Sequence, residues 1–197
     1  DGTYVIRLTA TDAAGNSAFD EMTFVKDTGA PSVNAGADKN SNTQISIDAT
    51  VTDGTALTYA WTKQSGPGTV TFGTATAEDT TIDASSDGSY VFRLTATDAA
   101  GNSAFDEMTF IKDTTAPGVN AGTDKISSTS VSQNATATDA TAMSYAWTKI
   151  SGPGTVTFGT ASAEDTTISA SADGSYVIRL TATDAAGNSA FDEMTLR

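Results

Sequence analysis

Two sets of acidic and amide side chains recur along the chain with the composition of a cation site. The first set comprises Asp27, Asp53, Asp98 and Asn102. The second set lies 86 residues further on and comprises Asp113, Asp139, Asp184 and Asn188. Calcium takes about six to eight oxygen ligands, chiefly from carboxylates, amides, backbone carbonyls and water. If the fold brings its members together, each set therefore predicts a Ca²⁺ site made of three carboxylates and one amide.

The same residues also have a purely structural interpretation. Asp and Asn in turns accept hydrogen bonds from their own backbone two residues further on, which makes an Asx turn. Asp53 opens a turn at 53–56, and Asp98 opens the loop 98–102. The sequence alone leaves both the calcium site and the Asx turns open.

Composition removes most catalytic chemistry. The chain has no histidine and no cysteine, so it lacks the usual general base, the usual zinc ligands and any disulfide. Asp106 and Glu107 are adjacent on a predicted strand and would point to opposite faces, so they do not form an acid–base pair. Trp61 and Trp147 alternate in phase with buried positions, which favours a core role over a sugar-stacking surface. We therefore expect no enzyme.

A repeat of fixed period organises the elements that must position these residues. The sequence TDAAGNSAFDEMT occurs at 11–23, 97–109 and 183–195, always 86 residues apart. A constant period indicates one structural module used repeatedly. We expect residues 30–115 (module A) and 116–197 (module B) to be complete modules. Residues 1–29 (the N-terminal hairpin) are then the last strand pair and connector of a truncated or split copy.

Each module has the pattern of an all-β fold. Apolar residues alternate over 45–51, 57–61 and 90–96, and turn signals separate these runs. No helical periodicity is present. The pattern predicts tandem immunoglobulin-like antiparallel β-sandwiches of about seven strands each. In that topology the connector, the turn after the second strand and the last hairpin loop share one end of the module, which would gather each acidic set at a joint.

Three finer expectations follow from strand phase. Phe105 is out of phase with Met108, so burying both would require a β-bulge near Phe105. Pairing across the 98–102 loop brings Arg93 level with Glu107. In module B, Gln133 replaces the inward-facing Ile47 of module A, and a polar side chain there predicts lower stability.

Charge and hydropathy limit the partners. A net charge of −14 argues against nucleic acid and anionic membrane surfaces as partners. No apolar run reaches the roughly 18 residues of a membrane-spanning helix, so no membrane insertion is expected in this segment. The sequence starts inside a copy of the repeat, which suggests part of a longer protein.

A family resemblance rests on two stretches of module A. Residues 59–72, YAWTKQSGPGTVTF, and 87–98, DGSYVFRLTATD, look like a PKD (polycystic kidney disease) domain, and the corresponding stretches recur in module B. The connectors also resemble joints of bacterial Ig-like repeats in large adhesins. PKD domains are immunoglobulin-like sandwiches found in tandem in extracellular proteins. The resemblance implies a spacer, adhesion or fibre role and supplies no catalytic residue.

The sequence thus predicts a non-enzymatic stalk or fibre segment at the cell surface, whose joints calcium would stiffen if the acidic sets bind it. Its partners would be neighbouring repeats and other copies in a fibre. One alternative is a self-assembling extracellular filament, in which the apolar side chains of residues 1–25 dock on another chain, because an isolated hairpin is marginally stable. Another is an accessory spacer of a secreted hydrolase.

Overall fold

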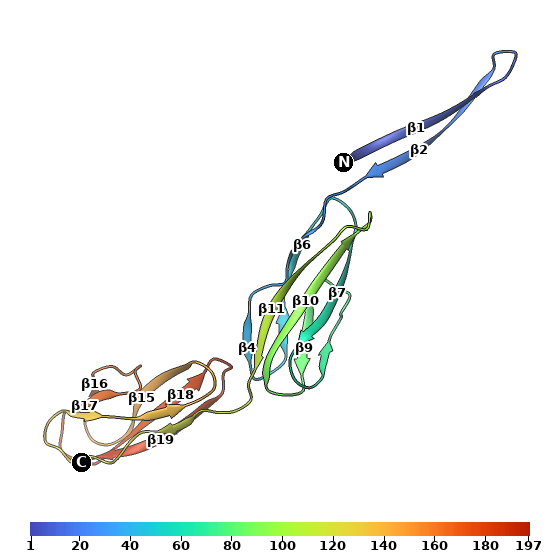
Figure 1. The fold of residues 1–197 in the computed structure, drawn as a ribbon. Helices are drawn as coiled ribbons and strands as arrows, with labels where there is room; N and C mark the ends of the chain where they lie inside the picture. The colour runs from blue at the N-terminus through green and yellow to red at the C-terminus, as the bar shows by residue number, and fades with distance from the viewer.

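The computed structural model describes residues 1–197, and its regular secondary structure consists of strands and no helix. The N-terminal hairpin, module A and module B follow one another end to end, as the colours of Figure 1 show. The two modules are β-sandwiches, which confirms the predicted all-β, immunoglobulin-like class. No helix is present that is long and apolar enough to cross a membrane.

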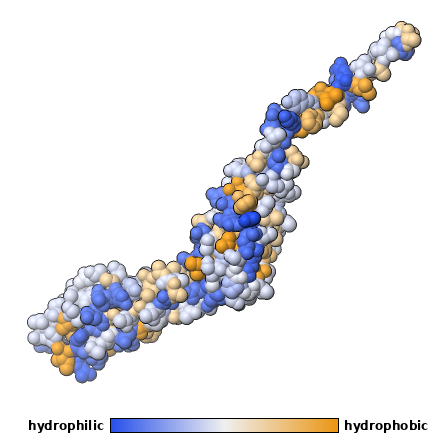
Figure 2. All heavy atoms as spheres, viewed as in Figure 1, coloured by the Kyte–Doolittle hydropathy of each residue, from blue (hydrophilic) through white to orange (hydrophobic).

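The N-terminal hairpin consists of β1 (Gly2–Thr11) and β2 (Ser17–Lys26), which pair only with each other. Its register runs without interruption from Gly2 opposite Lys26 to Thr11 opposite Ser17. One face carries apolar side chains that are between 47% and 75% exposed: Tyr4, Ile6, Leu8, Met22 and Phe24. Figure 2 shows orange, hydrophobic areas exposed along the narrow arm that the hairpin forms.

Module A has two facing layers of strands. One layer is a sheet of β4 (Lys39–Ser41), β11 (Ser103–Lys112), β10 (Gly88–Asp98) and β7 (Leu57–Ser65), in that spatial order. The opposite layer contains the sheet β5 (Ile45–Ile47), β9 (Thr80–Ala84) and β8 (Val70–Phe72), and the pair β3 (Ser32–Asn34) and β6 (Thr50–Thr52). The core lies between these layers and includes Trp61, Tyr90, Phe92, Leu94 and Phe110.

Module A contains more strands than the expected seven because two extended segments, 32–41 and 45–52, are each divided into two strands. In the first segment, β3 pairs with β6 and β4 pairs with β11. The alternating run 45–51 forms β5 and β6, which pair with different neighbours. Its inward positions Ile45, Ile47, Ala49 and Val51 are nevertheless all buried, as the alternation predicted. The segment therefore keeps one inner face while moving from one sheet to the other.

Module B repeats this arrangement with a shorter edge. Its sheets are β15 (Met143–Ser151), β18 (Tyr176–Asp184) and β19 (Ser189–Leu196); β13 (Val131–Gln133), β17 (Thr166–Ala170) and β16 (Val156–Phe158); and β12 (Gly118–Asn120) with β14 (Thr136–Thr138). The counterpart of β4 is reduced to a single parallel bridge between Lys125 and Leu196. The core of module B is correspondingly smaller than that of module A.

The predicted bulge at Phe105 is wrong. The pairing of β10 with β11 is continuous from Gly88 opposite Lys112 to Thr97 opposite Ser103. Phe105 stays out of phase with the core and is 56% exposed, with the Arg93 guanidinium 3.8 Å from its ring centroid. The ring stays on the outer face, where the guanidinium covers one side of it, so the strand needs no bulge to turn it inward. The expected pairing of Arg93 with Glu107 is confirmed, with a nitrogen–oxygen distance of 2.6 Å.

Candidate metal centre

The fold gathers the carboxylates of each predicted set at one end of a module. In the first cluster, one oxygen from each of Asp27, Asp53 and Asp98 lies within 4.8 Å of the others. Asp113, Asp139 and Asp184 meet the same criterion in the second cluster. Each cluster combines one residue just after a hairpin, one in a strand-to-strand turn, and one at the end of the long strand β10 or β18. The two clusters therefore lie at the two joints of the chain.

Asx turns are present at the same residues and orient their carboxylates. Asp53 Oδ1 accepts hydrogen bonds of 2.8 Å from both the backbone N and Oγ1 of Thr55. Asp139 Oδ1 accepts the equivalent pair from Thr141. In the second connector, Asp113 Oδ1 accepts a 2.9 Å bond from Thr115 N. Each turn occupies one oxygen and leaves the other available, so the structural use of these residues is compatible with a ligand role.

The loop that follows β18 holds Asp184 in its ionised form. Burial alone would raise the pKa of Asp184, but the side chain and backbone of Asn188 donate hydrogen bonds to the carboxylate and lower the pKa overall. Those bonds measure 2.7 Å from Nδ2 to Oδ2 and 2.8 Å from N to Oδ1. The pKa of Asp98 is lowered by the same arrangement with Asn102, again against the opposing effect of burial. An ionised carboxylate at neutral pH is the form that binds a cation.

The two asparagines of the predicted sets face their clusters through the amide nitrogen. Asn188 Nδ2 donates to Asp184 Oδ2 and also to the backbone oxygen of Asp113, at 2.9 Å. Asn102 Nδ2 makes the matching bond to the backbone oxygen of Asp27, at 3.3 Å. Both asparagines thus tie the loop to the incoming connector.

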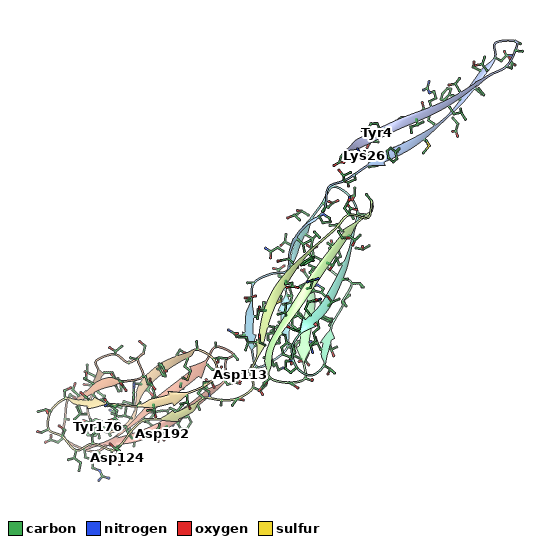
Figure 3. The ribbon with its side chains drawn as sticks, in the orientation of Figure 1. Tyr4, Lys26, Asp113, Asp124, Tyr176 and Asp192 are labelled. Carbon is green, nitrogen blue, oxygen red and sulfur yellow. The ribbon has the colours of Figure 1, made fainter.

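The second cluster contains a buried oxygen without a partner. Asp113 is only 6% exposed, and its Oδ2 is buried and accepts no hydrogen bond. Figure 3 places Asp113 where module A meets module B. Leaving a buried acceptor oxygen without a partner costs about 1–3 kcal/mol, and more when the group is charged. The three carboxylates of this cluster therefore fit a cation, which would reduce their mutual repulsion.

Other acidic residues have structural partners that the sequence did not identify. Asp106 Oδ2 accepts a 2.9 Å bond from Ala35 N, and Asp192 Oδ2 does the same for Ala121 N. Glu78 Oε1 accepts 2.7 Å from Val51 N. These carboxylates satisfy backbone donors across the sandwich, so much of the negative charge has a local role. The sequence signal that could have identified these carboxylates is that each recurs 86 residues away in the other module.

Both tryptophans are buried, which confirms their expected place in the core. Trp61 Nε1 donates to the backbone oxygen of Glu78 at 3.0 Å, and Trp147 Nε1 to that of Glu164 at 3.1 Å. Their polar atoms are satisfied inside the module, as buried polar atoms normally are. Neither ring is available as a surface platform.

Comparison with known proteins agrees with this architecture. A solved three-domain Ig fragment of titin shares 12% identity and a TM-score of 0.51, covering 85% of this chain and 65% of that one. Extracellular domains 3–5 of Drosophila OTK share 10% identity and a TM-score of 0.51, covering 98% of this chain and 70% of that one. At these identities the likeness concerns the fold alone.

Sequence comparison is more specific. The mouse protein named "Dyslexia-associated protein KIAA0319-like protein" is 32% identical over an alignment of 108 residues, which covers 50% of this chain and 10% of that protein. This chain therefore corresponds to only about a tenth of the length of that relative. The family model described as "K319L-like, PKD domain" matches residues 35–111 and again residues 121–197. The chain belongs to the K319L-like PKD domain family, with two copies in tandem.

Proposed function

We propose that this chain is a non-enzymatic spacer segment of an extracellular or cell-surface protein, and that calcium stiffens its joints. Support for the spacer role comes from the end-to-end arrangement in Figure 1 and from family membership. PKD domains are non-catalytic modules. We further propose the boundaries 1–29, 30–115 and 116–197, with the hairpin as the strand pair of another copy.

The observation that carries the calcium proposal is the buried, unpartnered Oδ2 of Asp113 beside two further carboxylates. Asp113 belongs to the connector, whereas Asp139 and Asp184 belong to module B. An ion held by all three would join the connector to the module and restrict its swivelling. Calcium is the best match among common cations, because the donors are all oxygens and calcium tolerates irregular geometry.

The first cluster would act in the same way at the other joint. Asp27 would supply the connector carboxylate, and Asp53 and Asp98 the module carboxylates. Asp27 is only half-buried, and its Oδ1 accepts a bond from Gly29 N at 3.0 Å. We expect weaker binding here, because no buried oxygen is left unsatisfied without the ion.

Thermal unfolding of the full chain in EDTA and in excess calcium tests this proposal. A ligand present at about 100 times its Kd stabilises the bound state by roughly 2.7 kcal/mol, so the Tm of module B should rise. Asp139→Asn should remove most of that rise. Asp173→Asn removes the same charge from an exposed loop of module B outside the cluster and should preserve it. An identical Tm with and without calcium would refute the calcium role while leaving the spacer role standing.

A second candidate function is self-assembly through the N-terminal hairpin. The exposed apolar face formed by Tyr4, Ile6, Leu8, Met22 and Phe24 favours it, because the same face of β10 and β11 is fully covered in module A. Size-exclusion chromatography with electron microscopy separates the two candidates. Ordered fibres that disappear on Leu8→Lys would support assembly, whereas monomeric rods would support the spacer alone.

A further inference from the structure

The two joints differ even though their loops have the same sequence. Loop 98–102 at the first joint and loop 184–188 at the second both read DAAGN. Ala100 in the first loop is exposed, whereas Ala186 in the second is 7% exposed. A residue of module A covers the second loop, and residues 1–29, which precede the first joint, contain no position equivalent to it.

The covering residue is Asn42 of module A. Its backbone N donates to the oxygen of Ala186 at 3.1 Å, and its side-chain Nδ2 donates to Asn188 Oδ1 at 2.9 Å. Asn42 directly follows β4, which pairs in parallel with the end of β11. That pairing holds Asn42 at the end of module A that faces module B.

Asn188 consequently connects three parts of the joint. Its amide nitrogen reaches Asp184 Oδ2 within its own loop and the backbone oxygen of Asp113 in the connector. Its amide oxygen accepts the bond from Asn42. At the first joint, Asn102 makes the two equivalent nitrogen bonds, but its oxygen accepts no hydrogen bond from the chain.

The bend at the second joint lies on the side of this contact. In Figure 1 both the hairpin and module B are inclined to module A, and module B turns away on the side where β4 lies. A contact between the segment after β4 and the loop after β18 would pull module B toward that side. The bend and the contact thus occur at the same joint and on the same side.

We propose that Asn42 and loop 184–188 form a latch that fixes the bend between modules A and B independently of any metal. The partner surface of Asn42 is the Ala186 carbonyl together with the Asn188 amide. The equivalent residue of module B is Ser128 (42 + 86 = 128), which has a shorter side chain and no amide. The latch is therefore a property of this joint and is not built into every copy of the repeat.

Pulsed electron–electron double resonance tests the latch by measuring the distance between two spin labels, one on each module. The chain has no cysteine, so two introduced cysteines carry the labels at chosen sites. Gln64→Cys and Ser162→Cys place labels on exposed positions of the two modules. The measurement is made in EDTA, so its outcome does not depend on calcium. The unmodified joint should give one narrow distance distribution.

Asn42→Ala should broaden that distribution and lower the ratio of latched to open arrangements about fivefold, as expected for one lost hydrogen bond. Asn42→Asp should broaden it too, because a carboxylate cannot donate to Asn188 Oδ1. Asn40→Ala is the matched control, since Asn40 is exposed on β4 and makes no side-chain hydrogen bond across the joint, and it should leave the distribution narrow. The latch is refuted if Asn42→Ala keeps the narrow distribution, or if Asn40→Ala broadens it equally. A latch that fails in EDTA while calcium still raises the Tm would leave the proposed calcium role intact.

Discussion

Gln133 holds in module B the core position that Ile47 holds in module A, and its Oε1 is buried without a hydrogen-bond partner. The side chain is 1% exposed. Its amide nitrogen contacts the backbone oxygens of Ala121 and Thr123. An unsatisfied buried acceptor typically costs about 1–3 kcal/mol, so this one position weakens module B.

Gln133→Ile should therefore stabilise module B by about 1–3 kcal/mol, because it removes the unsatisfied oxygen and restores the side chain that module A uses. Urea denaturation of the full chain, followed by tryptophan fluorescence, measures the change as a shift in the transition of module B while that of module A stays fixed. The reciprocal substitution Ile47→Gln should destabilise module A by a similar or larger amount. Unchanged or lower stability of Gln133→Ile would show that the amide bonds to Ala121 and Thr123 outweigh the unpaired oxygen.

The sequence predicted the buried positions and the strand register, because both depend on the alternation of residues along single strands and on the length of the loop between them. Alternation placed Tyr90, Phe92 and Leu94 in the core, and the loop length set the Arg93–Glu107 register. Strand phase also placed Phe105 outside the core. The prediction of a bulge was wrong because it assumed that a large aromatic side chain must be buried. An arginine on the same face covers the ring instead.

The sequence could not predict contacts that depend on how separate modules meet. Asn42 and Asn188 are 146 residues apart and make their bond across the joint. The repeat does not mark Asn42 as special, because the equivalent residue of module B is Ser128 and not asparagine. The acidic clusters were predictable because their members recur with the period, but the buried Asp113 oxygen depends on the packing around the connector.

The Arg93–Phe105 contact should contribute little to stability and should depend weakly on salt. Arg93 lies over the ring and pairs with Glu107 on the exposed face of the sheet. Exposed cation–π contacts are worth about 0.5–1 kcal/mol and surface ion pairs about 0–1 kcal/mol. A double-mutant cycle of Arg93→Ala and Phe105→Ala in urea denaturation should give a coupling of about 0.5 kcal/mol that persists in high salt. A coupling above about 2 kcal/mol would contradict the exposed geometry.

Acid should destabilise module B partly through Asp184. The pKa of this carboxyl is lowered in the folded chain from its ordinary value of 3.8, since the Asn188 hydrogen bonds outweigh burial. The unfolded state therefore binds the proton more readily. The stabilising contribution of Asp184 is fully present above its ordinary pKa and is lost as the pH falls through the lower, folded pKa.

Asp184→Asn should lower the stability of module B at neutral pH and make it fall less steeply between about pH 5 and pH 2. Urea denaturation in calcium-free buffer at several pH values measures both effects. Asp173→Asn serves as the control, because this exposed side chain makes no hydrogen bond within the chain. Equal acid slopes in the Asp184→Asn and unmodified chains would contradict the assignment.

Two glycines of module A with positive φ should respond very differently to alanine. Gly66 has φ +119°, and a Cβ added there would meet the ring of the fully buried Tyr90. Gly101 has φ +94°, but an added Cβ would have no atom within 4 Å. Gly101→Ala therefore carries backbone strain alone, about 1–2 kcal/mol. Gly66→Ala carries strain and also displaces a core ring, so we expect a loss of about 3–5 kcal/mol.

Urea denaturation of module A in the full chain compares the two variants, with Tyr90→Phe as a third. Tyr90 donates a 2.5 Å hydrogen bond to the backbone oxygen of Ser86, which holds the ring in place beside Gly66. Releasing that bond lets the ring move, so the double variant Gly66→Ala with Tyr90→Phe should lose less stability than the sum of the single variants. Additive losses, or equal losses at Gly66 and Gly101, would mean that backbone strain and not the ring sets the cost at Gly66.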